Sequence, residues 1–122
     1  PQLPEFKSLV VKGPYHPSAP IHLSLSYNVG APAGQILFIT PSRQAIVKAL
    51  QNYKDDWISL HSGQGKILEL SSCVRVFYPP SPAHLSVLMA MLTTDDQSAC
   101  LNPTATLDQP PSLVILHELS AY

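Results

Sequence analysis

Charged side chains are scarce in this chain of 122 residues. Seven Lys and Arg and eight Asp and Glu make up 12% of the sequence, and the formal net charge is −1. This is about half the usual share of charged residues. Proteins that bind nucleic acid tightly by charge normally carry a basic stripe, and the sequence has none. A disordered chain would be rich in charge and poor in apolar residues, whereas 45% of these residues are hydrophobic. The composition therefore predicts a packed core.

Cysteines and long apolar runs are also few. Cys73 and Cys100 have no CxxC partner, which argues against a disulfide framework or a structural zinc site and favours a reducing compartment. No apolar run approaches the roughly 20 residues of a membrane span. The first residues, PQLPEFKSL, lack the basic-then-apolar order of a secretory signal. The length predicts a single domain over residues 1–122, or a piece of a larger one.

Proline, in contrast, is abundant. The chain has 13 prolines, about twice the average share. Most of them gather in three clusters, within residues 14–20, 79–82 and 110–111. Proline fixes φ and has no N–H to donate, so we expect these clusters to mark where helices and strands begin and end.

Four short apolar runs between these clusters predict buried strands. They are Leu9–Lys12, Ile36–Thr40, Val74–Tyr78 and Leu113–Leu116. Three of the runs are almost continuously aliphatic, as strands covered on both faces of a parallel sheet are. Val74–Tyr78 alternates instead, and we expect it nearer an edge of the sheet.

Helical patterns separate the predicted strands. Ser42 is an N-cap candidate before one helix, and Ser81 followed by Pro82 is a capping signal before another. The segment Ser18–Val29 fits both a helix and an alternating strand, and we favour the helix. Strand–helix alternation predicts an α/β fold, with a mostly parallel sheet flanked by helices.

Two other segments, Lys54–Gly65 and Thr93–Gln109, are polar and rich in turn residues, and are predicted to be connections. The last predicted strand ends at Leu116. A sheet of this kind normally continues, so we expect further strands to be missing from the chain or replaced by a partner.

The stretch Gly13–Pro20 has the length and position of a phosphate-binding loop of the form GxxxxGK[ST]. Such a loop binds phosphate through backbone N–H groups and a lysine, and its hydroxyl holds magnesium. Here Gly13 keeps the first glycine, but Ser18, Ala19 and Pro20 take the places of the second glycine, the lysine and the hydroxyl. The loop is therefore predicted not to bind a triphosphate. An ordinary proline-rich connection is the competing interpretation.

Ser112–Glu118 (SLVILHE) has the form of a Walker B strand, in which an acidic metal partner follows apolar residues. His117 occupies the usual aspartate place and Glu118 comes next. Imidazole is a poor ligand for magnesium, which prefers oxygen. A histidine packed or capping at the strand end is therefore favoured over a ligand.

Four stretches together resemble the RecA-type core of recombinase paralogues. In chain order they are GPYHPSAP, GQILFITPSRQA, VRVFYPPSPAHLSVLMAML and PPSLVILHELSAY. The resemblance is greatest to the ATPase-like subunit of the Shu complex, which pairs with a zinc-binding SWIM-domain protein. It extends from about Leu9 to Tyr122 as weak patterns, without a diagnostic motif.

The resemblance implies a nuclear role in homologous recombination. It implies a hetero-oligomer with a SWIM-domain protein that assists a recombinase in forming its filament on single-stranded DNA. Family members that keep the phosphate loop hydrolyse ATP, but this chain departs at Ser18, Ala19, Pro20 and His117. ATP binding and hydrolysis are therefore not expected, and neither is another cofactor. The chain is interpreted as a pseudo-ATPase, not an enzyme, whose fold serves assembly.

Three other residues are candidates for contact with a partner or DNA. Arg43 and Lys48 lie in the second predicted helix, where surface solubility is the simpler role. Trp57 is the only tryptophan; it suits an interface anchor, and core packing is equally plausible. The five histidines lack the spacing of a metal site, so none is predicted.

Two alternative functions stay open. One is an inactive RecA-like subunit of another assembly, such as the Elongator tRNA-modification subcomplex. The other is an active enzyme that binds a small ligand at the carboxyl ends of its strands.

Overall fold

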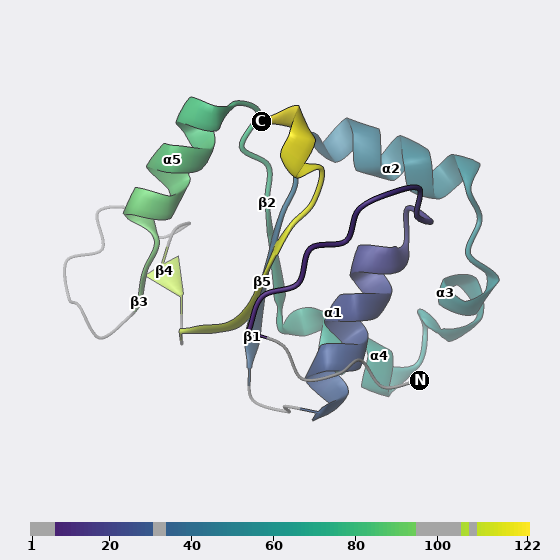
Figure 1. The fold of residues 1–122 in the computed structure, drawn as a ribbon. Helices are drawn as coiled ribbons and strands as arrows, with labels where there is room; N and C mark the ends of the chain where they lie inside the picture. Colours follow the sequence, from purple (N-terminus) through teal and green to yellow (C-terminus); the bar gives the residue numbers. More distant parts are fainter. Residues whose placement is uncertain (1–6, 31–33, 95–105, 108–109) are drawn as a thin grey trace.

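A computed structural model describes residues 7–30, 34–94, 106–107 and 110–122. Its centre is a three-stranded parallel sheet with helices on both sides (Figure 1). The strands, in the spatial order β2-β1-β5, are β1 (Gln35–Ile39), β2 (Val74–Phe77) and β5 (Pro111–Leu116). The helices on one side of the sheet are α1 (Ala19–Gly30), α2 (Arg43–Asn52) and α4 (Gly65–Ser72), and α5 (Pro82–Met91) lies on the other. The predicted α/β sheet is thus confirmed.

The core is built around β1, the central strand. Its apolar run Ile36–Ile39 is at most 5% exposed on either face, because helices cover both faces and β2 and β5 flank both edges. The edge strands are less covered: β2 is an edge, as predicted, and in β5 Val114 and Leu116 are 41% and 43% exposed. Burial on both faces was predicted for three apolar runs; of the two that form strands, it holds for β1 but not for β5.

Serine caps begin the helices that follow β1 and β2. The Ser42 Oγ accepts the N–H of Ala45 at 3.2 Å, at the start of α2. The Ser81 Oγ accepts the N–H of His84 at 3.3 Å, and Pro82 opens α5. Both caps were predicted from the sequence and are confirmed. Each satisfies a backbone donor that the first helical turn leaves free.

The predicted first strand is wrong. Leu9–Lys12 forms no strand, and Val10 and Val11 are 87% and 66% exposed. β-branched residues favour a strand only where a neighbouring strand and an apolar layer receive them, and this segment has neither. As a result, residues 13–20 do not join a strand to a helix. The helix favoured for Ser18–Val29 is confirmed as α1.

The prediction of Lys54–Gly65 as a mere connection is also wrong. It contains the short helix α3 (Asp56–His61), and α4 begins at Gly65. The cause is a side-chain cap: Oδ1 of Asp55 accepts the N–H of Ile58 at 3.0 Å. The helix has only six residues, too few for a 3.6-residue apolar period to show in the sequence.

Most of the other predicted connection, Thr93–Gln109, lies outside the described residues. Its described ends form β3 (Thr93–Thr94) and β4 (Thr106–Leu107), which pair in parallel. In the described parts of the chain, no helix is long and apolar enough to cross a membrane.

Because β1 is the centre of the core, shortening a side chain on β1 should destabilise the fold far more than shortening its partner on the edge strand β5. Ile39 is 0% exposed and is in register with the 43% exposed Leu116. We expect Ile39→Ala to lower the free energy of unfolding by about 2–5 kcal/mol, and Leu116→Ala to lower it by less than half as much. Urea unfolding of both variants measures the difference. Equal losses would show that β1 is not the centre of the core.

Candidate functional site

The carboxyl edge of the sheet is the first place to examine for a site. In open parallel sheets, ligands bind at the carboxyl ends of strands where neighbouring connections leave to opposite sides. Here β1 leads into α2 on one side, and the chain reaches β5 after α5 on the other (Figure 1). Thr40 directly follows β1 and His117 directly follows β5, so these two residues mark that point.

Four side chains form what we call the carboxyl-edge cluster: Tyr15, Thr40, His117 and Glu118. The Thr40 Oγ1 lies 3.1 Å from Nδ1 of His117, and the Tyr15 hydroxyl donates to Oε1 of Glu118 at 2.8 Å. The His117 ring stacks on Phe38, with centroids 5.6 Å apart, and receives the edge of the Tyr15 ring at 5.9 Å. The segment before α1 is thereby fastened to the end of β5.

The environment of the cluster alters two of its pKa values. Burial lowers the pKa of His117, against the opposing influence of the Glu118 carboxylate, and so favours a neutral imidazole. Burial raises the pKa of Tyr15 to about 12, and the hydrogen bond and charge of Glu118 add to the rise. Glu118 has left-handed backbone angles, φ 55° and ψ 44°, which are uncommon outside glycine. The cluster holds one carboxylate, and that carboxylate already accepts a hydrogen bond from Tyr15.

A second group, the α1–α3 network, consists of His16, Ser18, His22 and Asp55. The Ser18 hydroxyl donates to Oδ2 of Asp55 at 2.5 Å, and Nε2 of His22 lies 2.6 Å from the same oxygen. Nδ1 of His16 lies 2.7 Å from the Ser18 Oγ. Ser18 is only 2% exposed, and the Asp55 side chain is 16% exposed. The network joins the start of α1 to the start of α3.

Asp55 is the centre of this network because its two carboxylate oxygens bind different groups. Oδ1 caps α3, while Oδ2 accepts from Ser18 and faces His22. The hydrogen bonds from Ser18, His22 and the Ile58 N–H hold the pKa of Asp55 well below its ordinary value. A carboxylate, ionised at neutral pH, is thus fixed at the first turn of α1.

Trp57 lies beside this network on α3. Its ring stacks on His61 with centroids 4.5 Å apart, and His22 packs against it at 5.1 Å. The Trp57 side chain remains 41% exposed. Packing between two histidines fixes the indole while leaving part of it on the surface.

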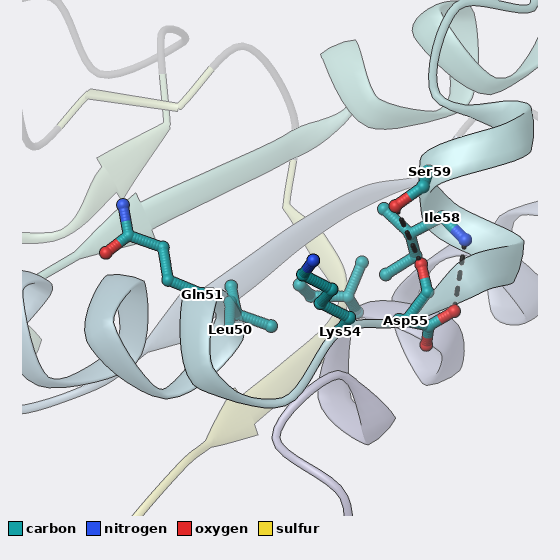
Figure 2. Close-up of a pocket in the computed structure, with 7 residues that line it drawn as sticks. Leu50, Gln51, Lys54, Asp55, Ile58 and Ser59 are labelled. Carbon is teal, nitrogen blue, oxygen red and sulfur yellow. Dashed lines mark hydrogen bonds between the residues drawn. The ribbon is translucent and has the colours of Figure 1, made fainter.

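A shallow pocket of about 450 Å³ adjoins the network (Figure 2). In Figure 2 the polar groups of Asp55 are turned towards α3, where its carboxylate caps Ile58 and its backbone oxygen accepts from Ser59. The pocket is lined by Ile21, Leu50, Gln51, Lys54, Asp55, Ile58 and Ser59. Its principal charged acceptor is therefore already used. Among the residues that the structure describes, no three His, Cys, Asp or Glu side chains are placed to hold a metal ion.

The residues of the predicted phosphate loop differ in how exposed they are and in what surrounds them. Gly13 is exposed, with φ 116° and open space around it. Ser18 is buried in the α1–α3 network, and Ala19 and Pro20 form the first turn of α1, the alanine exposed and the proline buried. Tyr15, between them in the chain, contacts His117. The stretch 13–20 thus lies beside the end of the predicted Walker B strand.

The predicted contact residues keep their accessibility. Arg43 opens α2 and Lys48 lies further along it, and both are exposed. Reasoning from the sequence did not predict that Asp55 would be the centre of a hydrogen-bond network. It also predicted no site contact for His22 or Tyr15. The acidic pair at 55–56 is compatible with a helix start or with a solvated loop, and no local pattern indicates that Ser18 would bond to it from 37 residues away.

Comparison of the chain with protein-family models, with curated proteins and with solved structures found no match.

Because the pKa of Asp55 is lowered in the folded protein, part of the free energy of unfolding should depend on pH. The unfolded carboxyl titrates near 3.8, so the stabilisation is complete above that pH and is lost as pH falls below it towards the lower folded pKa. We expect Asp55→Asn to reduce the free energy of unfolding at pH 7, and the gap to the unmodified chain to begin to narrow below about pH 4 and to shrink further as the pH falls. Urea unfolding across this range tests it, with Asp56→Asn as the control. A gap independent of pH would contradict the ionised network.

The raised pKa of Tyr15 gives a second test. Ultraviolet difference titration of the unmodified chain against Tyr15→Phe should show one tyrosine ionising near pH 12. In Glu118→Gln the carboxylate charge is gone, so the pKa should fall, though not to 10, because burial still disfavours the phenolate. Ionisation of Tyr15 near pH 10 in the unmodified chain would contradict the contact with Glu118.

Proposed function

We propose that this protein is a non-catalytic, RecA-like subunit of a homologous-recombination complex, in which it assists assembly of the recombinase filament through protein contacts. The proposal takes the family from the sequence resemblance. The structure adds a parallel α/β sheet with capped helices after β1 and β2, and it adds the environment of residues 13–20.

The observation that carries the proposal is the carboxylate at the start of α1. A phosphate-binding loop places its anion at the first turn of the following helix, where N–H groups and the helix dipole attract negative charge. Here Asp55 is placed at that turn through Ser18, at 2.5 Å. Pro20 has no N–H, and Ala19 has no cationic group. An ionised carboxylate repels phosphate, so this turn suits a fold that no longer binds a nucleotide.

The position of residues 13–20 also supports a RecA-like origin. Contacts of Tyr15 with His117 and Glu118 bring this stretch to the carboxyl edge beside β5. A phosphate loop and a Walker B strand act on one nucleotide and must therefore meet at one edge of the sheet. Because Leu9–Lys12 forms no strand, the support comes from this proximity and not from chain connection.

Exposed apolar surface on α5 fits a role in assembly. Val87, Met89 and Met91 are 56%, 50% and 40% exposed, and no residue of the helix Pro82–Met91 is Lys, Arg, Asp or Glu. Apolar patches on a soluble domain usually mark a contact with another protein. Methionine is also common at surfaces that adapt to a partner.

Nucleotide titration tests the loss of catalysis. We expect calorimetric titration with Mg-ATP to show no saturable binding at micromolar ligand, and the turnover of ATP to equal that of buffer. Asp55→Asn is the matched variant, since it removes the repelling charge and leaves a similar side chain. Micromolar binding by the unmodified chain would overturn the pseudo-ATPase and favour an active enzyme at the carboxyl edge.

Capture of partners tests the role in recombination. Affinity purification of the full chain followed by mass spectrometry should recover a SWIM-domain protein and a recombinase. A charge reversal at Arg43 and Lys48 should reduce their recovery several-fold if these exposed cations touch the partner, whereas Lys66→Glu on α4 serves as the control. Recovery of sister RecA-like subunits of a tRNA-modification assembly, or of no recombination protein, would contradict the proposal.

A further inference from the structure

The outer edge of β5 has no strand beside it among the described residues. The amide of His117 donates to the carbonyl of Ile39 on β1. Because N–H groups alternate in direction along a strand, the amides of Val114 and Leu116 point away from β1. Unpaired strand edges attract other strands, so proteins normally cover them.

The segment Leu9–Lys12 leads directly to a residue that is anchored beside the end of β5. Tyr15, three residues after Lys12, donates to Glu118, two residues beyond the end of β5. From Tyr15 back to Leu9 an extended chain spans roughly 20 Å, which is about the length of the six-residue β5.

The handedness of the connections gives independent support. Crossovers between parallel strands are right-handed in nearly all proteins. The connection from β1 to β2 passes through α2 and α4 on one side of the sheet, and α1 lies on that same side (Figure 1). A strand that enters β1 through α1 on that side must therefore lie on the β5 side of β1. The position next to β1 is taken by β5, so the free position is the outer edge of β5.

Composition and hinge geometry fit the same position. Val10 and Val11 are β-branched and 87% and 66% exposed, an unfavourable arrangement unless the segment has a second state. Gly13, at φ 116° with nothing within contact distance, provides a free pivot between this segment and the Tyr15 anchor.

We infer that Leu9–Lys12 is a strap that closes on the outer edge of β5 as a fourth, parallel strand, and that the structure shows the strap open. The closed strap guards the edge and competes with any strand that another protein offers to it. This inference rests on the fold alone and does not depend on the proposed function.

Hydrogen exchange of the full chain tests closure directly. If the strap closes in solution, the amides of Val114 and Leu116, and alternate amides within Val10–Lys12, should exchange at least about tenfold more slowly than in unstructured peptides. Exchange of these amides at the unstructured rate would overturn the inference, and this measurement requires no variant.

The double variant Val10→Pro, Val11→Pro removes an N–H that faces β5 in either alignment of the strap and should abolish closure, so Val114 and Leu116 should lose their protection. Val10→Thr keeps the β-branched shape and should retain it. Since Val10 is 87% exposed, the rest of the fold should persist in both, which circular dichroism verifies. Protection of Val114 and Leu116 that survives the double proline variant would mean that a different segment covers the edge, and would overturn the inference.

Discussion

The burial of β1 between two parallel neighbours is the constraint on which the rest of the molecule depends. Ile36 and Ile39 have no exposed surface, and backbone hydrogen bonds leave β1 on both edges. A strand placed in this way fixes the ends of β2 and β5 beside its own. The carboxyl-edge cluster follows directly: Thr40 and His117 come within 3.1 Å because the strands before them are in register.

A second constraint comes from Asp55, whose carboxylate joins the starts of two helices. The start of α1 presents positive partial charge, and so does the start of α3. One carboxylate serves both helices, capping α3 through one oxygen and accepting from Ser18 and His22 through the other. A helix start that has its own carboxylate gains little from a phosphate. Asp55 thus holds the junction between α1 and α3 together.

The sequence predicted those elements whose signals are local. Ser42 and Ser81 are N-caps that can be recognised from the few residues around them. The continuous apolar run Ile36–Ile39 is typical of a strand covered on both faces. Prediction failed where the outcome depends on distant neighbours. Leu9–Lys12 has strand propensity, but a strand needs a partner, and pairing cannot be read from four residues. The contact between Ser18 and Asp55 likewise depends on how α1 and α3 pack.

The distribution of charge links these observations to assembly. Most described charged residues lie on α2, α3, α4 and the segments around them, while α5 and β5 carry none. An uncharged helix with exposed Val87 and Met89 gains from burial only when another apolar surface meets it. The outer edge of β5 also needs a partner, because its outward N–H and C=O groups require hydrogen bonds wherever water is excluded. A partner that covered the β5 edge would exclude water from its backbone groups. Those groups would then need a strand to pair with, and Leu9–Lys12 leads directly to Tyr15, whose hydroxyl donates to Glu118 just beyond β5.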